Sequence, residues 1–162
     1  MTAPDANLPQ QDERIMAALA HISAFLPMMG LIAPVLIWLL QKDKSPFVRF
    51  QALQAIAYQI AMLVAYFLGM GCYMVFFFLT FFTLPFAGSE GLSGVGGIVA
   101  LVLFLLPVAV MGLMFLGGLA FISYAVVAAV ATIRGRHFRY AILGAKIERF
   151  LEPGGAVAPT GL

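Results

Sequence analysis

The sequence predicts an all-α integral membrane protein, a helical bundle of three transmembrane helices with an amphipathic C-terminal helix. Composition is the first indication, since 63% of the 162 residues are apolar and 10% are charged, against about 45–50% and about 25% in soluble domains. The second indication is the mean hydropathy of +1.03. The third is the placement of charge, because residues 15–41, 50–89 and 91–133 contain no Asp, Glu, Lys or Arg. A chain of this length cannot bury so much apolar surface in water, so lipid is expected to solvate most of it.

The first span is expected over about residues 15–40. A transmembrane helix needs roughly 20 apolar residues to cross a hydrocarbon core of about 30 Å. Pro27, Gly30 and Pro34 interrupt this run, and each proline removes a backbone hydrogen bond. We expect them to kink one crossing helix, because two halves of roughly 10–14 residues are short for crossing. A re-entrant hairpin that bends between Pro27 and Pro34 is the alternative.

The second and third spans are expected over about residues 55–85 and 95–133. The run 50–85 would be about 54 Å long as one helix, which exceeds the bilayer core. Its first part is therefore expected at the interface or packed against protein. Pro107 is expected to bend the third span. A fourth span is the alternative, formed if the chain folds back at Gly117–Gly118.

The basic residues predict the orientation. Lys and Arg stay on the cytoplasmic side of a membrane. Eight of the nine lie between the first two runs or after the third, Arg14 alone precedes the first run, and the loop 86–93 contains none. Three spans then place the N-terminus and the loop 86–93 outside, and the C-terminus in the cytoplasm, in a bacterial inner (plasma) membrane. Residues 1–11 and 153–162 are expected to be disordered ends, with the membrane domain over 12–152.

One face of the second run changes from polar to small residues. At about 100° per residue, six side chains share this face: Gln51, Gln54, Tyr58, Ala61, Ala65 and Gly69. Small residues at four-residue spacing let helices approach closely in lipid, and side-chain amides hydrogen-bond between helices. This face is therefore expected at a helix interface, and a glutamine-lined pore or ligand cavity is the alternative. The opposite face is bulky and apolar and is expected to face lipid, with Leu53, Ile56, Ile60, Leu63 and Phe67.

The sequence offers little for catalysis, so we predict a protein that is not an enzyme and that has no cofactor, metal or catalytic site. His21 is the one strongly titratable side chain in the three runs, and we interpret it as a hydrogen-bonded residue of a helix interface. Three spans would place His21 and His137 roughly 30 Å apart, which excludes a pair of haem ligands. A re-entrant first run would remove that objection. Cys72, the single cysteine, lies in an apolar run where the thiolate is disfavoured.

Cationic residues near the membrane surface are better candidates for contacts. Arg134, Arg136 and Arg139 lie close together with aromatic neighbours, a cluster typical of contacts with lipid phosphates or with an acidic partner. The alternative is an anchor that only fixes topology. Residues 141–152 are expected to form an amphipathic helix along the inner leaflet.

Three motifs carry a resemblance to a known family. They are E-R-x-x-A-A-L-A-H at Glu13–His21, W-L-L-Q-K-D-K-S-P-F-V-R-F at Trp38–Phe50, and R-G-R-H-F-R-Y at Arg134–Tyr140. Over about residues 12–150 the chain resembles small bacterial membrane proteins of unknown function that are grouped with the chloroplast inner-envelope import (Tic) channel subunit. The resemblance implies a helical bundle and, for the plastid branch, a part in protein translocation.

The central motif also predicts how a helix begins. Ser45 suits the N-cap position and Pro46 the first turn. Arg49 would then lie one turn into the helix, at the inner interface, as a candidate contact for lipid or a partner.

The function expected from the sequence is that of a non-enzymatic inner-membrane subunit that assembles with other proteins. Its expected partners are membrane lipid and either another membrane protein or a second copy of the chain. A nucleic-acid partner is not expected, because the formal net charge is only +2. A channel or translocon-like component is the alternative.

Overall fold

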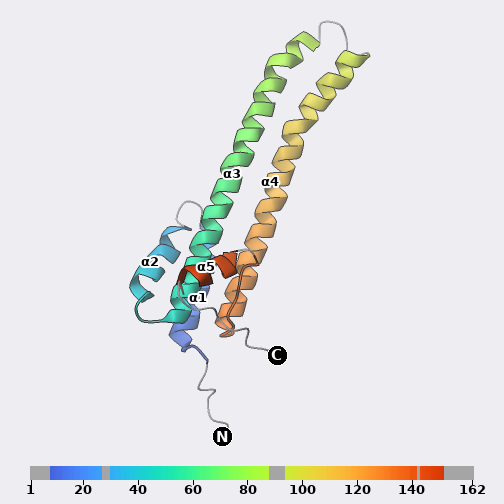
Figure 1. The fold of residues 1–162 in the computed structure, drawn as a ribbon. Helices are drawn as coiled ribbons and strands as arrows, with labels where there is room; N and C mark the ends of the chain where they lie inside the picture. The colour runs from blue at the N-terminus through green and yellow to red at the C-terminus, as the bar shows by residue number, and fades with distance from the viewer. Residues whose placement is uncertain (1–7, 27–29, 88–93, 142, 152–162) are drawn as a thin grey trace. The chain divides into compact units, whose positions relative to one another are not determined.

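The fold is all-helical in a computed structural model that describes residues 8–26, 30–87, 94–141 and 143–151. Within these residues every regular element is a helix, which confirms the all-α prediction (Figure 1). The elements are α1 (Gln11–Ile22), the 3₁₀ turn η1 (Ser23–Phe25), α2 (Ile32–Gln41), α3 (Pro46–Ala87), α4 (Val95–Ile133) and α5 (Leu143–Leu151).

The chain divides into two compact units. Unit 1 comprises residues 1–60 and 122–162, and unit 2 comprises residues 61–121. Unit 1 therefore contains α1, η1, α2 and α5 together with the first part of α3 and the last part of α4 (Figure 1). Unit 2 contains the remaining, more apolar parts of the two long helices.

Two of the described helices are long and apolar enough to cross a membrane. They are Pro46–Pro85, with 40 residues, and Val95–Ile133, with 39 residues. The second has the bounds expected for the third span and passes through Gly117–Gly118 without a break. The fold-back that would have made a fourth span is therefore wrong.

The region expected to form the first span is divided into two short helices. α1 and α2 contact each other, and their direction is antiparallel, because Gln41 near the end of α2 reaches Met16 near the start of α1 (Nε2 to Sδ, 3.0 Å). One kinked helix over 15–40 is therefore not what forms, and a third span is not shown. The arrangement has the form of the hairpin that was the alternative, although Pro27 lies outside the described residues.

A serine explains how the chain turns within this hairpin. Pro34 has no N–H, so it cannot donate to the carbonyl of Gly30 four residues earlier. The Ser23 hydroxyl lies 2.9 Å from that Gly30 oxygen and 2.9 Å from the oxygen of Ala20. Ser23 thus serves the carbonyl that Pro34 leaves without a helical donor, and this contact joins the end of α1 to the start of α2.

Small residues let α1 pack closely on the first part of α3. One buried cluster contains Ala17, Phe47 and Val48, and a second contains Ala20, Ala52 and Ala55. Because alanine side chains barely extend beyond the backbone, the two helices approach closely. Ile37 and Trp38 of α2 complete these clusters.

The start of α3 forms as the sequence predicts. The Val48 N–H donates to Ser45 Oγ at 3.2 Å, so Ser45 is the N-cap and Pro46 the first helical residue. The predicted C-terminal helix also forms, as α5 (Leu143–Leu151). It presents both apolar and charged faces, and Phe150 is 77% exposed.

In unit 2 the two long helices lie side by side (Figure 1). Pro107 lies inside α4 and leaves the carbonyl of Leu103 without its helical donor. The Thr80 hydroxyl of α3 lies 2.6 Å from that Leu103 oxygen and 2.8 Å from the oxygen of Phe76. A hydroxyl from the neighbouring helix thus satisfies a backbone group that would otherwise be unpaired in lipid, which is a costly state.

Candidate functional site

A network of buried polar groups ties three segments of unit 1 together. Gln54 Nε2 donates to the Phe138 carbonyl at 2.9 Å, and Gln54 Oε1 accepts the Tyr140 N–H at 2.8 Å. Gln51 Nε2 donates to the same Phe138 oxygen at 3.2 Å. On the other side of the network, His21 Nε2 lies 3.1 Å from Gln51 Oε1, and His21 Nδ1 lies 3.2 Å from the Tyr140 hydroxyl oxygen. The network therefore joins α1, α3 and the segment that follows α4.

The geometry fixes which tautomer a neutral His21 adopts. The Phe138 carbonyl can only accept, so the amide nitrogen of Gln51 must face it and the amide oxygen must face His21. Since Gln51 Oε1 is an acceptor, His21 Nε2 carries the proton and donates. Nδ1 then accepts the Tyr140 hydroxyl proton, so each ring nitrogen is satisfied in the neutral imidazole.

Burial reinforces this neutral state. His21 is 1% exposed, and both glutamines are fully buried. Burial disfavours the imidazolium and lowers the pKa of His21 from 6.5 to about 4, although the hydrogen bond with Gln51 opposes that change. Burial likewise raises the pKa of Tyr140, with the nearby Tyr58 and Tyr124 adding to the shift.

Aromatic rings enclose the network. Tyr140 stacks on Tyr58 with ring centroids 4.1 Å apart, and the ring of Tyr124 lies 5.2 Å from that of Tyr140 in an edge-on arrangement. Phe138 meets His21 edge-on at 6.2 Å. An enclosed group with both nitrogens satisfied has no free position for a substrate, so the arrangement suits a structural tie between segments rather than chemistry on a ligand.

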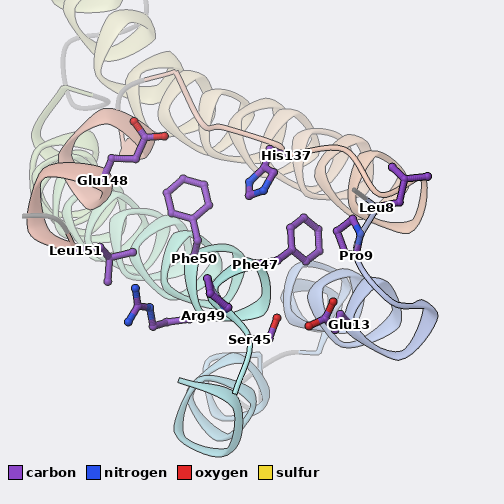
Figure 2. A pocket seen from close by; sticks show the side chains of 11 residues that line it. Leu8, Pro9, Glu13, Ser45, Phe47, Arg49, Phe50, His137, Glu148 and Leu151 are labelled. Atoms are coloured by element: carbon purple, nitrogen blue, oxygen red, sulfur yellow. The ribbon is translucent and has the colours of Figure 1, made fainter. Parts of the chain in front are cut away.

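A cleft of about 490 Å³ lies elsewhere in unit 1, around the start of α3 (Figure 2). Its wall is formed by Leu8, Pro9, Glu13, Ser45, Pro46, Phe47, Arg49, Phe50, His137, Glu148 and Leu151. Figure 2 shows Glu13 and Glu148 on opposite sides of the view, with the rings of Phe47, Phe50 and His137 between them. The His137 ring meets the Phe47 ring edge-on at 5.0 Å. The cleft combines charged and aromatic groups, and its size is within the range of small-molecule sites.

The candidate cationic contacts lie in different surroundings. Arg134, Arg136 and Arg139 are exposed, and Arg139 forms an ion pair with Glu148. Arg49 is half-buried in the wall of the cleft.

The residues of the predicted helix-interface face also lie in different surroundings. Gln51 and Gln54 lie in the buried network, and Tyr58 is half-buried beside it. Ala61 and Ala65 are exposed. Gly69 faces α4, where a Cβ atom would lie 3.0 Å from the Met114 side chain. The interface role of the exposed alanines stays a prediction.

Within the described parts of the chain, no three His, Cys, Asp or Glu side chains gather as ligands for a metal ion. Cys72 is exposed on α3. His21 and His137 do not lie on opposite sides of a membrane-spanning bundle as three spans would require. His21 contacts Tyr140 in the same unit in which His137 contacts Phe47, so the separation of roughly 30 Å was wrong.

Sequence reasoning missed the roles of Phe138 and Tyr140. Both stand beside the basic cluster, where aromatic residues are typical of membrane anchors, yet they provide the carbonyl, the N–H and the hydroxyl that complete the network. The sequence pointed to these roles only through the re-entrant alternative for the first run. That alternative places the start of the chain and the tail on the same side of the membrane.

Comparison with known protein families assigns residues 12–147 to MamF/MmsF, the magnetosome magnetite crystal formation protein family. The resemblance to the family of the Tic channel subunit is therefore wrong. Comparison with curated proteins and with solved structures gave no match.

Proposed function

Because the chain belongs to the magnetosome magnetite crystal formation protein family, we propose that it is a membrane protein that takes part in forming magnetite crystals. The match over residues 12–147 carries this proposal, since it includes all of unit 2, most of unit 1, and every described helix apart from the first residue of α1 and the end of α5. We propose further that its role is non-enzymatic, as a subunit that assembles with other proteins of the magnetosome membrane.

The exposed surface of unit 2 supports the membrane part of the proposal. Large apolar side chains project from both of its helices, with Phe67 70% exposed, Leu113 72% exposed and Val95 78% exposed. Such a surface is unfavourable in water and normal in lipid.

The distribution of charge supports one orientation. All nine Lys and Arg residues lie within the sequence ranges of unit 1, and Lys and Arg mark the cytoplasmic side. Two crossing helices return the chain to the side from which it started. We therefore propose that α3 and α4 cross the membrane once each and that α1 and α5 both lie on the cytoplasmic side.

The satisfied network in unit 1 supports a role in assembly rather than catalysis. It fixes α1, α3 and the segment after α4 against one another without leaving a titratable group open to a substrate. A rigid unit of this kind presents Arg134 and Arg136, which are exposed, in a defined arrangement for a partner or for lipid headgroups.

Deletion of the gene in a magnetite-forming cell tests the function. We expect crystals of altered size or number, measured by electron microscopy, and recovery of the normal distribution when the wild-type gene is restored. Unchanged crystals in the deletion strain would contradict a part in crystal formation. Crosslinking in native membranes tests the assembly role, and a chain that is recovered only as a monomer without partners would contradict it.

Labelling with an impermeant maleimide tests the orientation. In a Cys72→Ser background, Leu8→Cys and Arg136→Cys are expected to stay unlabelled in intact spheroplasts, while Ser89→Cys between α3 and α4 is labelled. A third span would instead expose the cysteine at position 8. Permeabilised cells provide the control, because all three sites must react there.

A further inference from the structure

The cleft at the start of α3 has an unpaired cation in its wall. Arg49 Nε is buried and has no hydrogen-bond partner. A buried guanidinium N–H without an acceptor is costly, and ionised donors form the stronger hydrogen bonds. The wall of the cleft therefore includes a guanidinium with one N–H group that no acceptor in the described chain serves.

The two carboxylates of the same wall are already engaged. Glu148 forms the ion pair with Arg139, and Glu13 Oε2 accepts the N–H of Gln10 at 2.8 Å as part of the capping box of α1. Their charge is thus partly compensated by neighbours, whereas that of Arg49 is not. Of the three charged side chains that line the cleft, Arg49 is therefore the one whose charge no described neighbour pairs.

The N-terminus of helix α3 adds little to anion binding. Pro46 has no N–H, the Val48 N–H is bonded to Ser45 Oγ, and the Arg49 N–H is bonded to the Ser45 carbonyl at 2.9 Å. The binding group that this wall offers is therefore the side chain of Arg49.

Apolar groups beside Arg49 indicate which kind of anion fits. Phe47 and Phe50 lie in the same wall, and Leu151 of α5 lies close to Arg49 in the view of Figure 2. The apolar stretch Pro46–Pro85, long enough to cross a membrane, begins at this point. A free anion gains nothing from apolar walls, whereas a phospholipid brings a phosphate together with glycerol and acyl carbons.

We propose that this cleft binds the phosphodiester headgroup of a membrane phospholipid, with Arg49 as its cationic contact and Phe47, Phe50 and Leu151 against the glycerol region. The site needs only that the chain lies in a membrane, so it does not depend on a part in magnetite formation. If the lipid site is disproved, the proposed part in magnetite formation is unaffected.

Binding of short-chain phosphatidylglycerol to the purified full chain in detergent tests the proposal. Arg49→Gln is expected to weaken binding at least about ten-fold, as for loss of a charged hydrogen bond, while Arg49→Lys retains part of the affinity. Arg134→Gln is the matched control, since it removes an exposed cation that does not line the cleft. Equal losses in both glutamine variants would overturn the site, because they would show only a general attraction to positive charge.

Two further measurements keep the proposal testable if Arg49→Gln does not fold. Inorganic phosphate serves as a competitor of the wild-type protein, and displacement of the lipid at equal concentration would show a free-phosphate site and overturn the proposal. A photoactivatable phospholipid with its reactive group near the phosphate is expected to label peptides that contain Phe50 or Leu151. Labelling confined to residues 61–121 would also overturn it.

Discussion

Units 1 and 2 satisfy their polar groups in different ways. Buried polar side chains of the described chain are concentrated in unit 1, with His21, Ser23, Ser45, Gln51, Gln54 and Thr132, whereas unit 2 has Thr80. Unit 1 therefore depends on particular side-chain hydrogen bonds between distant segments. Unit 2 depends on the internal hydrogen bonds of two helices and on contacts among apolar groups. A single polar change, or a change in pH, should consequently affect unit 1 more than unit 2.

One hydrogen-bonding arrangement occurs in both units. In each, a hydroxyl serves the carbonyl that a proline leaves unpaired, Ser23 for the oxygen of Gly30 in unit 1 and Thr80 for the oxygen of Leu103 in unit 2. The units therefore differ in how many such side-chain hydrogen bonds they contain. Two local probes can measure the stability of each unit separately. Trp38, the single tryptophan, packs in unit 1, and Cys72 of unit 2, exposed on α3, can carry a dye that is attached in denaturing detergent.

The largest effect is expected for Gln54→Leu. This change leaves the Tyr140 N–H without its acceptor and removes one donor from the Phe138 oxygen. We expect the free energy of unfolding of unit 1 to fall by about 3 kcal/mol, measured by Trp38 fluorescence in mixed detergent micelles. The dye on Cys72 should report little change.

Gln41→Leu is the matched control for this experiment. The Gln41 side chain is half-buried and reaches only the weak acceptor Met16 Sδ, so its loss should cost less than about 1 kcal/mol. Equal stability of Gln54→Leu and the wild type would show that the network is not what holds unit 1 together.

Acidification is expected to act on unit 1 alone. The pKa of His21 is lowered from 6.5 to about 4 by burial, so the unfolded chain takes up a proton below pH 6.5 while the folded chain does not. Stability is thus fully present above pH 6.5 and falls as the pH is lowered toward 4, by about 2 kcal/mol between pH 7 and pH 5. Trp38 fluorescence measures this loss.

Two histidine variants separate His21 from other titrating groups. His21→Gln should remove most of the dependence between pH 7 and pH 5, whereas His137→Gln, which changes an exposed ring outside the network, should retain it. The polar groups packed on His21 are Gln51 and the hydroxyl of Tyr140, with the rings of Tyr58 and Tyr124 beyond Tyr140. An undiminished pH dependence in His21→Gln would assign the effect to other groups.

The sequence predicted those features that depend on neighbouring residues. The uninterrupted apolar run gave the bounds of α4, Ser45 and Pro46 gave the start of α3, and the alternation of apolar and charged residues gave α5. Each of these depends on periodicity, on a cap or on hydrophobicity over a few turns, and such local terms can be read from the chain.

Features that depend on distant contacts were not predictable in the same way. The hairpin of α1 and α2 depends on the packing of Ala17 and Ala20 against α3 and on the reach of Ser23 to Gly30. The network depends on the backbone of Phe138, which is 84 residues from Gln54. Neither the hairpin nor the network produces a periodic pattern in the sequence.

The incorrect family resemblance has a related physical explanation. Its first two motifs contain the alanines that pack α1 on α3 and the serine that caps α3. Such residues specify how helices meet, and proteins with unrelated functions can share them. They therefore indicated the helical architecture correctly and the function incorrectly.

A smaller effect is expected for Thr80→Val in unit 2. This change leaves the Leu103 oxygen unpaired and should cost about 1 kcal/mol, measured with the dye on Cys72. Adding Pro107→Ala returns a helical N–H to that oxygen and should recover most of the loss. Thr83→Val is the control, because its hydroxyl contacts carbonyls of its own helix only. Equal losses at the two threonines would contradict the pairing of Thr80 with the proline site.

The smallest effect compares two glycines of α3 that differ only in what faces them. A Cβ at Gly71 would meet nothing within 4 Å, whereas a Cβ at Gly69 would lie 3.0 Å from the Met114 side chain. Gly71→Ala should therefore stabilise unit 2 by about 0.5 kcal/mol through helix propensity. Gly69→Ala should gain less than Gly71→Ala, because Met114 must shift to admit the methyl group. The dye on Cys72 measures both variants in the same micelles. Equal gains would mean that Met114 moves without cost, and that the contact between the two helices of unit 2 is looser at this position than the contacts of unit 1.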